Sequence, residues 1–137
     1  MGKLLLVCAG GAIGSGARYL VAEWAHAVLP AGLPWGTAIV NVTGSFFIAA
    51  VLDTAARTNL VSPEMRLFLT TGIAGGFTTY SSFNNETLQL IASANYPVAV
   101  ANVLGTLILC LGAGLLGILA SRASTAALTR LALGSDR

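Results

Sequence analysis

The chain has 137 residues, of which 55% are hydrophobic and only 9% are charged, and its formal net charge is +2. Soluble domains carry about a quarter charged residues, so this composition excludes a soluble protein and predicts an integral membrane protein. The positive charge is too small and too scattered to indicate a nucleic-acid partner. Because a membrane-crossing helix needs about 20 mostly apolar residues, the chain has room for one all-α domain of four spans.

We place the four spans at residues 4–25, 35–52, 64–92 and 97–120, within a single transmembrane domain that comprises residues 1–137. Residues 121–137 form a tail that we interpret as a short surface helix or a frayed end. The third span is the longest of the four, so it has room for an interruption.

The first span combines a small-residue surface with a single intramembrane charge. Its surface contains Gly10, Gly11, Gly14 and Gly16, which suit close contact with another helix. Arg18 is the only cation inside any span, and a charge at that depth costs at least about 2.5 kcal/mol unless it faces water or a partner. Two interpretations stay open: Arg18 lines an aqueous vestibule, or its side chain reaches the nearer membrane interface.

The second span carries a polar face. Asn41 lies well inside the span, and Thr37 shares its face one helical turn earlier. A carboxamide inside hydrocarbon needs partners, so this face meets protein or water. It provides either an interhelical hydrogen bond, worth about 0.6 kcal/mol, or a donor directed into a pore. We count Thr37 and Asn41 as candidate pathway residues.

Glycines interrupt the third span. Gly72, Gly75 and Gly76 lie close together, and each weakens a helix by about 1 kcal/mol relative to alanine. We predict a break near residues 75–79, which frees carbonyls and amides that lipid cannot satisfy. Broken helices at membrane depth commonly bind ions through these groups. The alternative is that the glycines only allow two helices to pack closely.

Aromatic and hydroxyl side chains follow this predicted break. Tyr80 and Phe83 are three residues apart and share one helix face, and Ser81 and Ser82 lie beside it. Hydroxyl groups clustered next to a glycine-rich break favour an ion-binding role over simple packing. Beyond them, Glu86 leads toward water.

The fourth span contains one polar pair, Asn102 and Thr106, spaced to share a face of a packing helix. No catalytic arrangement is present in the sequence: it has no Ser/His/Asp set, no pair of carboxylates within a span and no phosphate-binding loop before a helix. We therefore do not expect an enzyme.

Three motifs taken together resemble the Fluc (CrcB-like) family of small bacterial fluoride channels, and the resemblance covers nearly the whole chain. The motifs are Gly10-Gly11-x-x-Gly14 with Arg18-Tyr19, Gly36-Thr37-x-x-x-Asn41-x-x-Gly44, and Gly75-Gly76-Phe77-Thr78-Thr79-Tyr80-Ser81-Ser82-Phe83. The resemblance implies a multi-pass channel that exports toxic fluoride across the bacterial cytoplasmic (inner) membrane by passive electrodiffusion. It also implies an antiparallel, dual-topology-type dimer of four-helix subunits, each with a broken third helix, and two fluoride pores.

The resemblance also implies roles for individual residues. A structural sodium ion (Na+) at the dimer centre would bind the backbone carbonyls of Gly75 and Thr78. Fluoride would meet an amide, two aromatic rings, two hydroxyl groups, a vestibule cation and an acidic group at the far end, which are those of Asn41, Tyr80, Phe83, Ser81, Ser82, Arg18 and Glu86. Because fluoride is small and strongly hydrated, such donors and positive ring edges replace its water.

Two features bear on how closely the chain follows the family pattern. The first aromatic position is ordinarily Phe, and Tyr80 adds a hydroxyl group there. The loop and tail cations all fall on one side of a four-span topology; they are Lys3, Arg57, Arg66, Arg122, Arg130 and Arg137. Such a bias sets orientation, so it favours a subunit that pairs with a paralogous one in a heterodimer. Charges in the distal tail count less toward orientation, so a homodimer, as single-gene members form, remains the first expectation and the heterodimer is the alternative.

Two other classes of membrane protein share part of this pattern. A small multidrug transporter also has four helices and an antiparallel dimer, but it needs a titratable carboxylate in the first span, and no Asp or Glu occurs between Lys3 and Ala22. A non-transporting membrane assembly protein would explain the glycines. It would not explain a broken helix that also carries hydroxyl groups.

Overall fold

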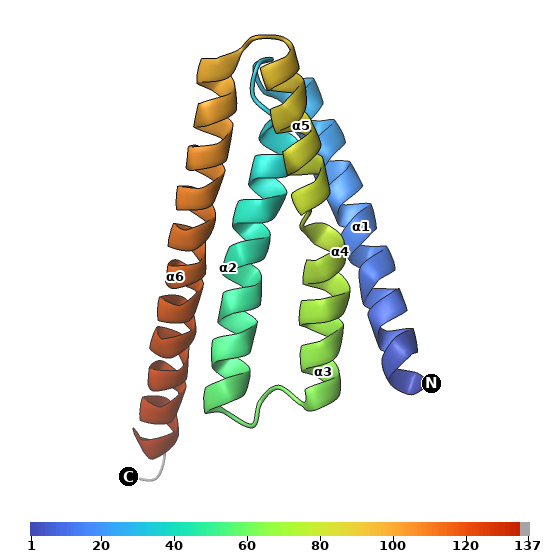
Figure 1. Cartoon of the computed structure of the whole chain (residues 1–137). Helices are drawn as coiled ribbons and strands as arrows, with labels where there is room; N and C mark the ends of the chain where they lie inside the picture. The colour runs from blue at the N-terminus through green and yellow to red at the C-terminus, as the bar shows by residue number, and fades with distance from the viewer. Residues whose placement is uncertain (135–137) are drawn as a thin grey trace.

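Three apolar stretches form uninterrupted helices, α1 (Gly2–Val28), α2 (Trp35–Arg57) and α6 (Tyr96–Gly134) (Figure 1). Each is long and apolar enough to cross a membrane. The structure, a computed structural model, describes the backbone of residues 1–134 and the side chains of residues 1–128 and Arg130. The all-α class and the membrane character predicted from composition are confirmed.

The third segment is divided into shorter pieces: α3 (Pro63–Leu67), the π-helix η1 (Phe68–Ala74), α4 (Gly75–Phe77) and α5 (Tyr80–Ala92). Thr78 and Thr79, between α4 and α5, have extended backbone, with ψ angles of 159° and 117°. Thr79 caps α5, because its Oγ1 accepts a hydrogen bond from the Ser82 N–H at 3.1 Å. The interruption falls inside the interval 75–79 predicted from the sequence.

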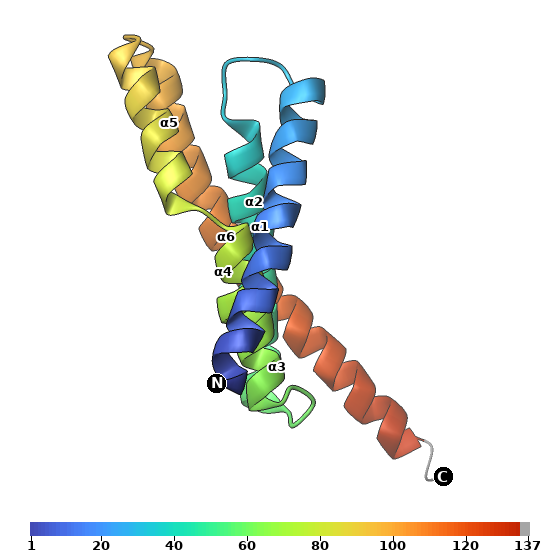
Figure 2. The same cartoon turned by 90° about the vertical axis from the view of Figure 1, so that its right-hand side faces the viewer.

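This break changes the neighbours of the third segment. The first half, from α3 to α4, packs along α1, whereas α5 contacts only α2 and α6 among the described elements. Figure 2 shows this change of neighbour, with α3 and α4 beside α1 and α5 beside the upper part of α6. Since α2 contacts both halves, the two helix ends at the break face α2.

Glycines bring α1 and the first half of the third segment into backbone contact. A Cβ added at Gly10 would lie 2.7 Å from the Phe68 carbonyl oxygen, and one at Gly76 would lie 2.6 Å from the Gly11 carbonyl oxygen. No real side chain fits at such distances, so these positions require glycine. The glycines of the third segment therefore provide close packing as well as preceding the break.

Helix α6 continues past the position where the sequence predicted the fourth span to end. We expected an end near residue 120 and a separate tail, but one helix runs from Tyr96 to Gly134. No proline or glycine lies between Gly117 and Gly134 to stop the helix. Just past residue 120, the hydroxyl group of Ser121 in α6 is hydrogen-bonded to the hydroxyl group of Thr54 in α2, at 2.9 Å. The end of α6 projects away from the other helices (Figure 2), and residues 135–137 of the tail lie outside the described part.

Candidate functional site

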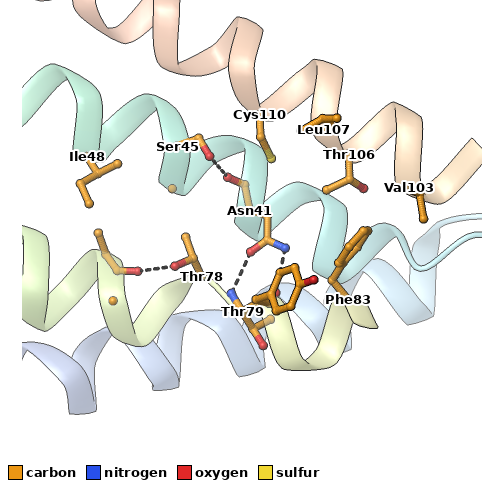
Figure 3. A pocket seen from close by; sticks show the side chains of 14 residues that line it. Asn41, Ser45, Ile48, Thr78, Thr79, Phe83, Val103, Thr106, Leu107 and Cys110 are labelled. Atoms are coloured by element: carbon orange, nitrogen blue, oxygen red, sulfur yellow. Dashed lines mark hydrogen bonds between the residues drawn. The ribbon is translucent and has the colours of Figure 1, made fainter. Parts of the chain in front are cut away.

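A cleft of about 470 Å³ opens where α2, the break, α5 and α6 meet (Figure 3). Five residues that the sequence predicted to contact an ion lie along it, namely Asn41, Gly75, Thr78, Tyr80 and Phe83. The polar face of α2 and the broken third segment, 38 residues apart in the chain at Asn41 and Thr79, thus come together at one place.

The Asn41 carboxamide pairs with the backbone of the break. Its Nδ2 donates to the Thr79 carbonyl oxygen at 2.9 Å, and the Thr79 N–H donates to its Oδ1 at 2.8 Å. Thr79 is only 7% exposed, so these backbone groups would otherwise be buried without partners. The interhelical hydrogen bond considered from the sequence is therefore present. The second N–H of the Asn41 amide is still available to another acceptor.

Two carbonyl groups at the break lose their usual helical donors, one to the Asn41 pairing and one to the Thr79 cap. In an unbroken helix the Thr79 N–H would donate to the Gly75 carbonyl, but here it donates to Asn41. Likewise the Ser82 N–H, the helical partner of the Thr78 carbonyl, donates to the Thr79 hydroxyl. Gly75 and Thr78 are the two residues whose carbonyls the family resemblance assigns to sodium. Carbonyl oxygens at an unwound helix are suitable ligands for that ion.

The two aromatic residues form a pair at the start of α5. The ring centroids of Tyr80 and Phe83 are 5.9 Å apart and their planes are tilted by 46°. Phe83 is half-buried, whereas Tyr80 is 78% exposed on this chain. Both line the cleft, and aromatic rings carry a positive edge that is able to meet an anion.

Ser81 and Ser82 do not line the cleft. Their hydroxyl groups gather around the Thr79 hydroxyl, which lies 3.3 Å from Ser81 Oγ and donates to Ser82 Oγ at 3.0 Å. Sequence reasoning gave Thr79 no role, although it joins the Asn41 pairing to the cap of α5. The signal was available: a threonine just before a helix is a favourable N-cap.

Thr37 and Glu86 lie at a second hollow, of about 310 Å³, beneath the loop between α1 and α2. Thr37 Oγ1 donates to Glu86 Oε1 at 2.6 Å. Glu86 Oε2 is buried and has no hydrogen-bond partner among the described residues. The polar face of α2 therefore makes hydrogen bonds to the third segment at two places, from Asn41 to the break and from Thr37 to α5.

The polar pair predicted on the fourth span has two separate environments. Thr106 lines the cleft, whereas Asn102 is 4% exposed and donates to Thr87 of α5 at 2.9 Å. Arg18 is half-buried on α1 and lines neither hollow. Among residues 1–134 the structure gives Arg18 no ion pair.

Comparison with known proteins identifies relatives over most of the chain. Residues 5–118 match the model of a family described as CrcB-like protein, Camphor Resistance (CrcB). The match contains the cleft and the break, and it ends before the last part of α6.

Several similar proteins carry the name fluoride-specific ion channel FluC. One from Anaeromyxobacter dehalogenans is 50% identical over 113 residues, which are 82% of this chain and 90% of that protein. One from Sorangium cellulosum is also 50% identical over 113 residues, 82% of this chain and 89% of that protein. One from Geobacter sulfurreducens is 43% identical over 122 residues, 89% of this chain and 98% of that protein.

Proposed function

The chain belongs to the family of CrcB-like proteins, and on that basis we propose that it is a fluoride-selective ion channel. In this proposal it exports toxic fluoride across a bacterial cytoplasmic (inner) membrane by passive electrodiffusion. The observation that carries the proposal is the break at Thr78 and Thr79, which opens onto the cleft beside Asn41, Tyr80 and Phe83. Relatives named as fluoride-specific channels support the choice of ion.

The proposed pathway replaces the water around fluoride with weak and strong donors of this chain. Asn41 contributes the N–H that its pairing with Thr79 leaves available. Tyr80 and Phe83 contribute positive ring edges, and Thr106 contributes a hydroxyl group from α6. A larger halide would fit between these fixed groups less well, and it would gain less from them.

We propose a dimer because the cleft of one chain leaves Tyr80, 78% exposed, at its margin, and we take the antiparallel arrangement from what the family resemblance implies. A second subunit would cover this ring and complete the walls of each pore. The partner is a second copy of this chain or, as the one-sided distribution of Lys and Arg would favour, a paralogous subunit. Membrane lipid surrounds the assembly.

The carbonyls of Gly75 and Thr78 would hold a structural sodium ion at the centre of the dimer. Their freedom from helical hydrogen bonds supports this assignment. When bound, sodium would link the two broken helices without a buried anionic side chain. Asn41 and the Thr79 cap keep the break in the shape that presents these carbonyls.

Growth in fluoride tests the proposed function. Expression of the chain in a bacterium that lacks its own fluoride exporter should restore growth at fluoride concentrations that stop cells with an empty vector. If the channel is a heterodimer, restoration requires the paralogous gene as well. Failure of both arrangements, with the protein present in the membrane, would contradict the proposal.

A further inference from the structure

Two buried residues outside the cleft are connected to one of its aromatic residues. Asn102 of α6 is 4% exposed and Thr87 of α5 is 9% exposed. Asn102 Nδ2 donates to Thr87 Oγ1 at 2.9 Å, and Thr87 Oγ1 donates to the Phe83 carbonyl oxygen at 2.8 Å. A relay of two hydrogen bonds thus joins α6 to the backbone of Phe83. Asn102 itself does not line the cleft.

Helix α5 depends strongly on such attachments. It contacts only α2 and α6 among the described elements. Asn41 and Thr37 attach it to α2, through Thr79 and Glu86 respectively. The bond from Asn102 to Thr87 attaches it to α6.

The attached face of α5 is the one that bears the aromatic pair. Tyr80, Phe83 and Thr87 follow the spacing i, i+3 and i+7, which places them along one side of a helix. A bond at Thr87 therefore fixes the rotation of α5 about its axis. Because a helix with its side chains has a radius of about 5 Å, a rotation of about 10° moves a ring by about 1 Å.

We propose that Asn102 is a positioning residue for conduction: through Thr87 it sets the rotation of α5 and hence the placement of the Phe83 and Tyr80 rings against the ion. This inference rests on the proposed function, because it assigns Asn102 a part in fluoride passage. A residue that only stabilised the fold would change the amount of folded protein. A positioning residue also changes the rate for each folded dimer.

Fluoride efflux from liposomes with equal amounts of folded dimer tests this inference. Asn102→Leu and Thr87→Val remove the relay with little change in volume, and each should lower the efflux rate severalfold. The double variant should be no slower than the slower single variant, because both changes break the same relay. Thr87→Ser keeps the hydroxyl group and should conduct fluoride at the wild-type rate. If Asn102→Leu does not fold, the near-isosteric Thr87→Val and its serine counterpart decide the question.

The matched control is another interhelical hydroxyl bond on α6. Thr54→Val removes the 2.9 Å bond to Ser121, which lies away from the cleft. It should lower thermal stability and leave the efflux rate per folded dimer unchanged. If Asn102→Leu and Thr87→Val behave like Thr54→Val, the inference is wrong while the proposed function stands. If the wild-type protein passes no fluoride, the proposed function fails and this inference with it.

Discussion

The two halves of the third segment are attached to the bundle in opposite ways. The half from α3 to α4 packs backbone to backbone on α1, at glycines where no side-chain atom fits. The other half, α5, contacts α2 and α6 and is held by individual polar side chains, those of Asn41, Thr37 and Asn102. One half is fixed by close contact, and the other by hydrogen bonds.

This difference gives the two halves of the third segment different parts: the first half supports the fold, and the second half carries the aromatic residues of the proposed pathway. Close backbone packing holds the end of the first half rigidly, so the backbone carbonyls at the break have fixed positions. Hydrogen bonds set the direction of α5, which carries Tyr80 and Phe83 into the cleft. Changes in the first half should therefore affect folding, and changes around α5 should affect conduction.

The largest effect is expected in the first half. In Gly76→Ala the new Cβ would lie 2.6 Å from the Gly11 carbonyl oxygen, so α1 and α4 must separate. Overpacking of this kind costs about 1–3 kcal/mol of stability. The fraction of dimer that survives heating in detergent, measured by size-exclusion chromatography, should fall sharply. Gly16→Ala is the control, since nothing lies within 4 Å of its added Cβ; equal loss in both variants would contradict the packing account.

At the junction of the halves, Asn41→Asp should nearly abolish fluoride flux. The carboxylate keeps an acceptor for the Thr79 N–H but loses the donor to the Thr79 carbonyl and puts an anion on the pathway. Efflux from liposomes with equal dimer content measures this. Thr43→Val, on the same helix and bonded only to its own preceding turn, should conduct normally. Normal flux through folded Asn41→Asp would place Asn41 outside the pathway.

On α5, Phe83→Ile should lower the flux clearly, although less than Asn41→Asp does. The substitution keeps an apolar side chain and removes the ring, with its positive edge, whose centroid lies 5.9 Å from that of Tyr80. Thermal stability should change little, because Phe83 lies on the cleft and is only half-buried. A variant that is unstable but conducts at the normal rate per dimer would identify Phe83 as a packing residue.

The smallest effect is expected at Tyr80. Tyr80→Phe removes a hydroxyl group that is able to bond fluoride, and a hydrogen bond to a charged group is worth about 1.5–3 kcal/mol. We expect the flux to rise severalfold, because an ion held less tightly leaves the site faster, and we expect dimer stability to stay unchanged. Should Tyr80→Phe and Phe83→Ile both match the wild type, the pathway would lie elsewhere.

Much of this arrangement could be predicted from local sequence. Apolar runs predicted the helices, and Gly72, Gly75 and Gly76 predicted the interruption, because helix propensity is a local property. The continuous α6 was also predictable in principle, since no glycine or proline separates residue 118 from residue 133. The sequence prediction placed a separate tail after residue 120, whereas the helix continues to Gly134.

The partners of the polar groups could not be predicted in this way. Asn41 finds Thr79 across 38 residues, and Asn102 finds Thr87 across 15, because tertiary packing chooses which elements meet. The spacing of Asn102 and Thr106 placed them on one face, yet a single face of α6 meets both α5 and the cleft. The turn of Ser81 and Ser82 toward Thr79 likewise follows from the cap geometry of α5.

The central claim is that this chain conducts fluoride selectively through the cleft at the break. The most direct measurement is the efflux of fluoride and of chloride from liposomes that contain the purified protein, with a potassium ionophore to balance charge. We expect fluoride to leave rapidly and chloride to stay inside. Comparable efflux of the two ions, or retention of both by folded dimer, would contradict this claim.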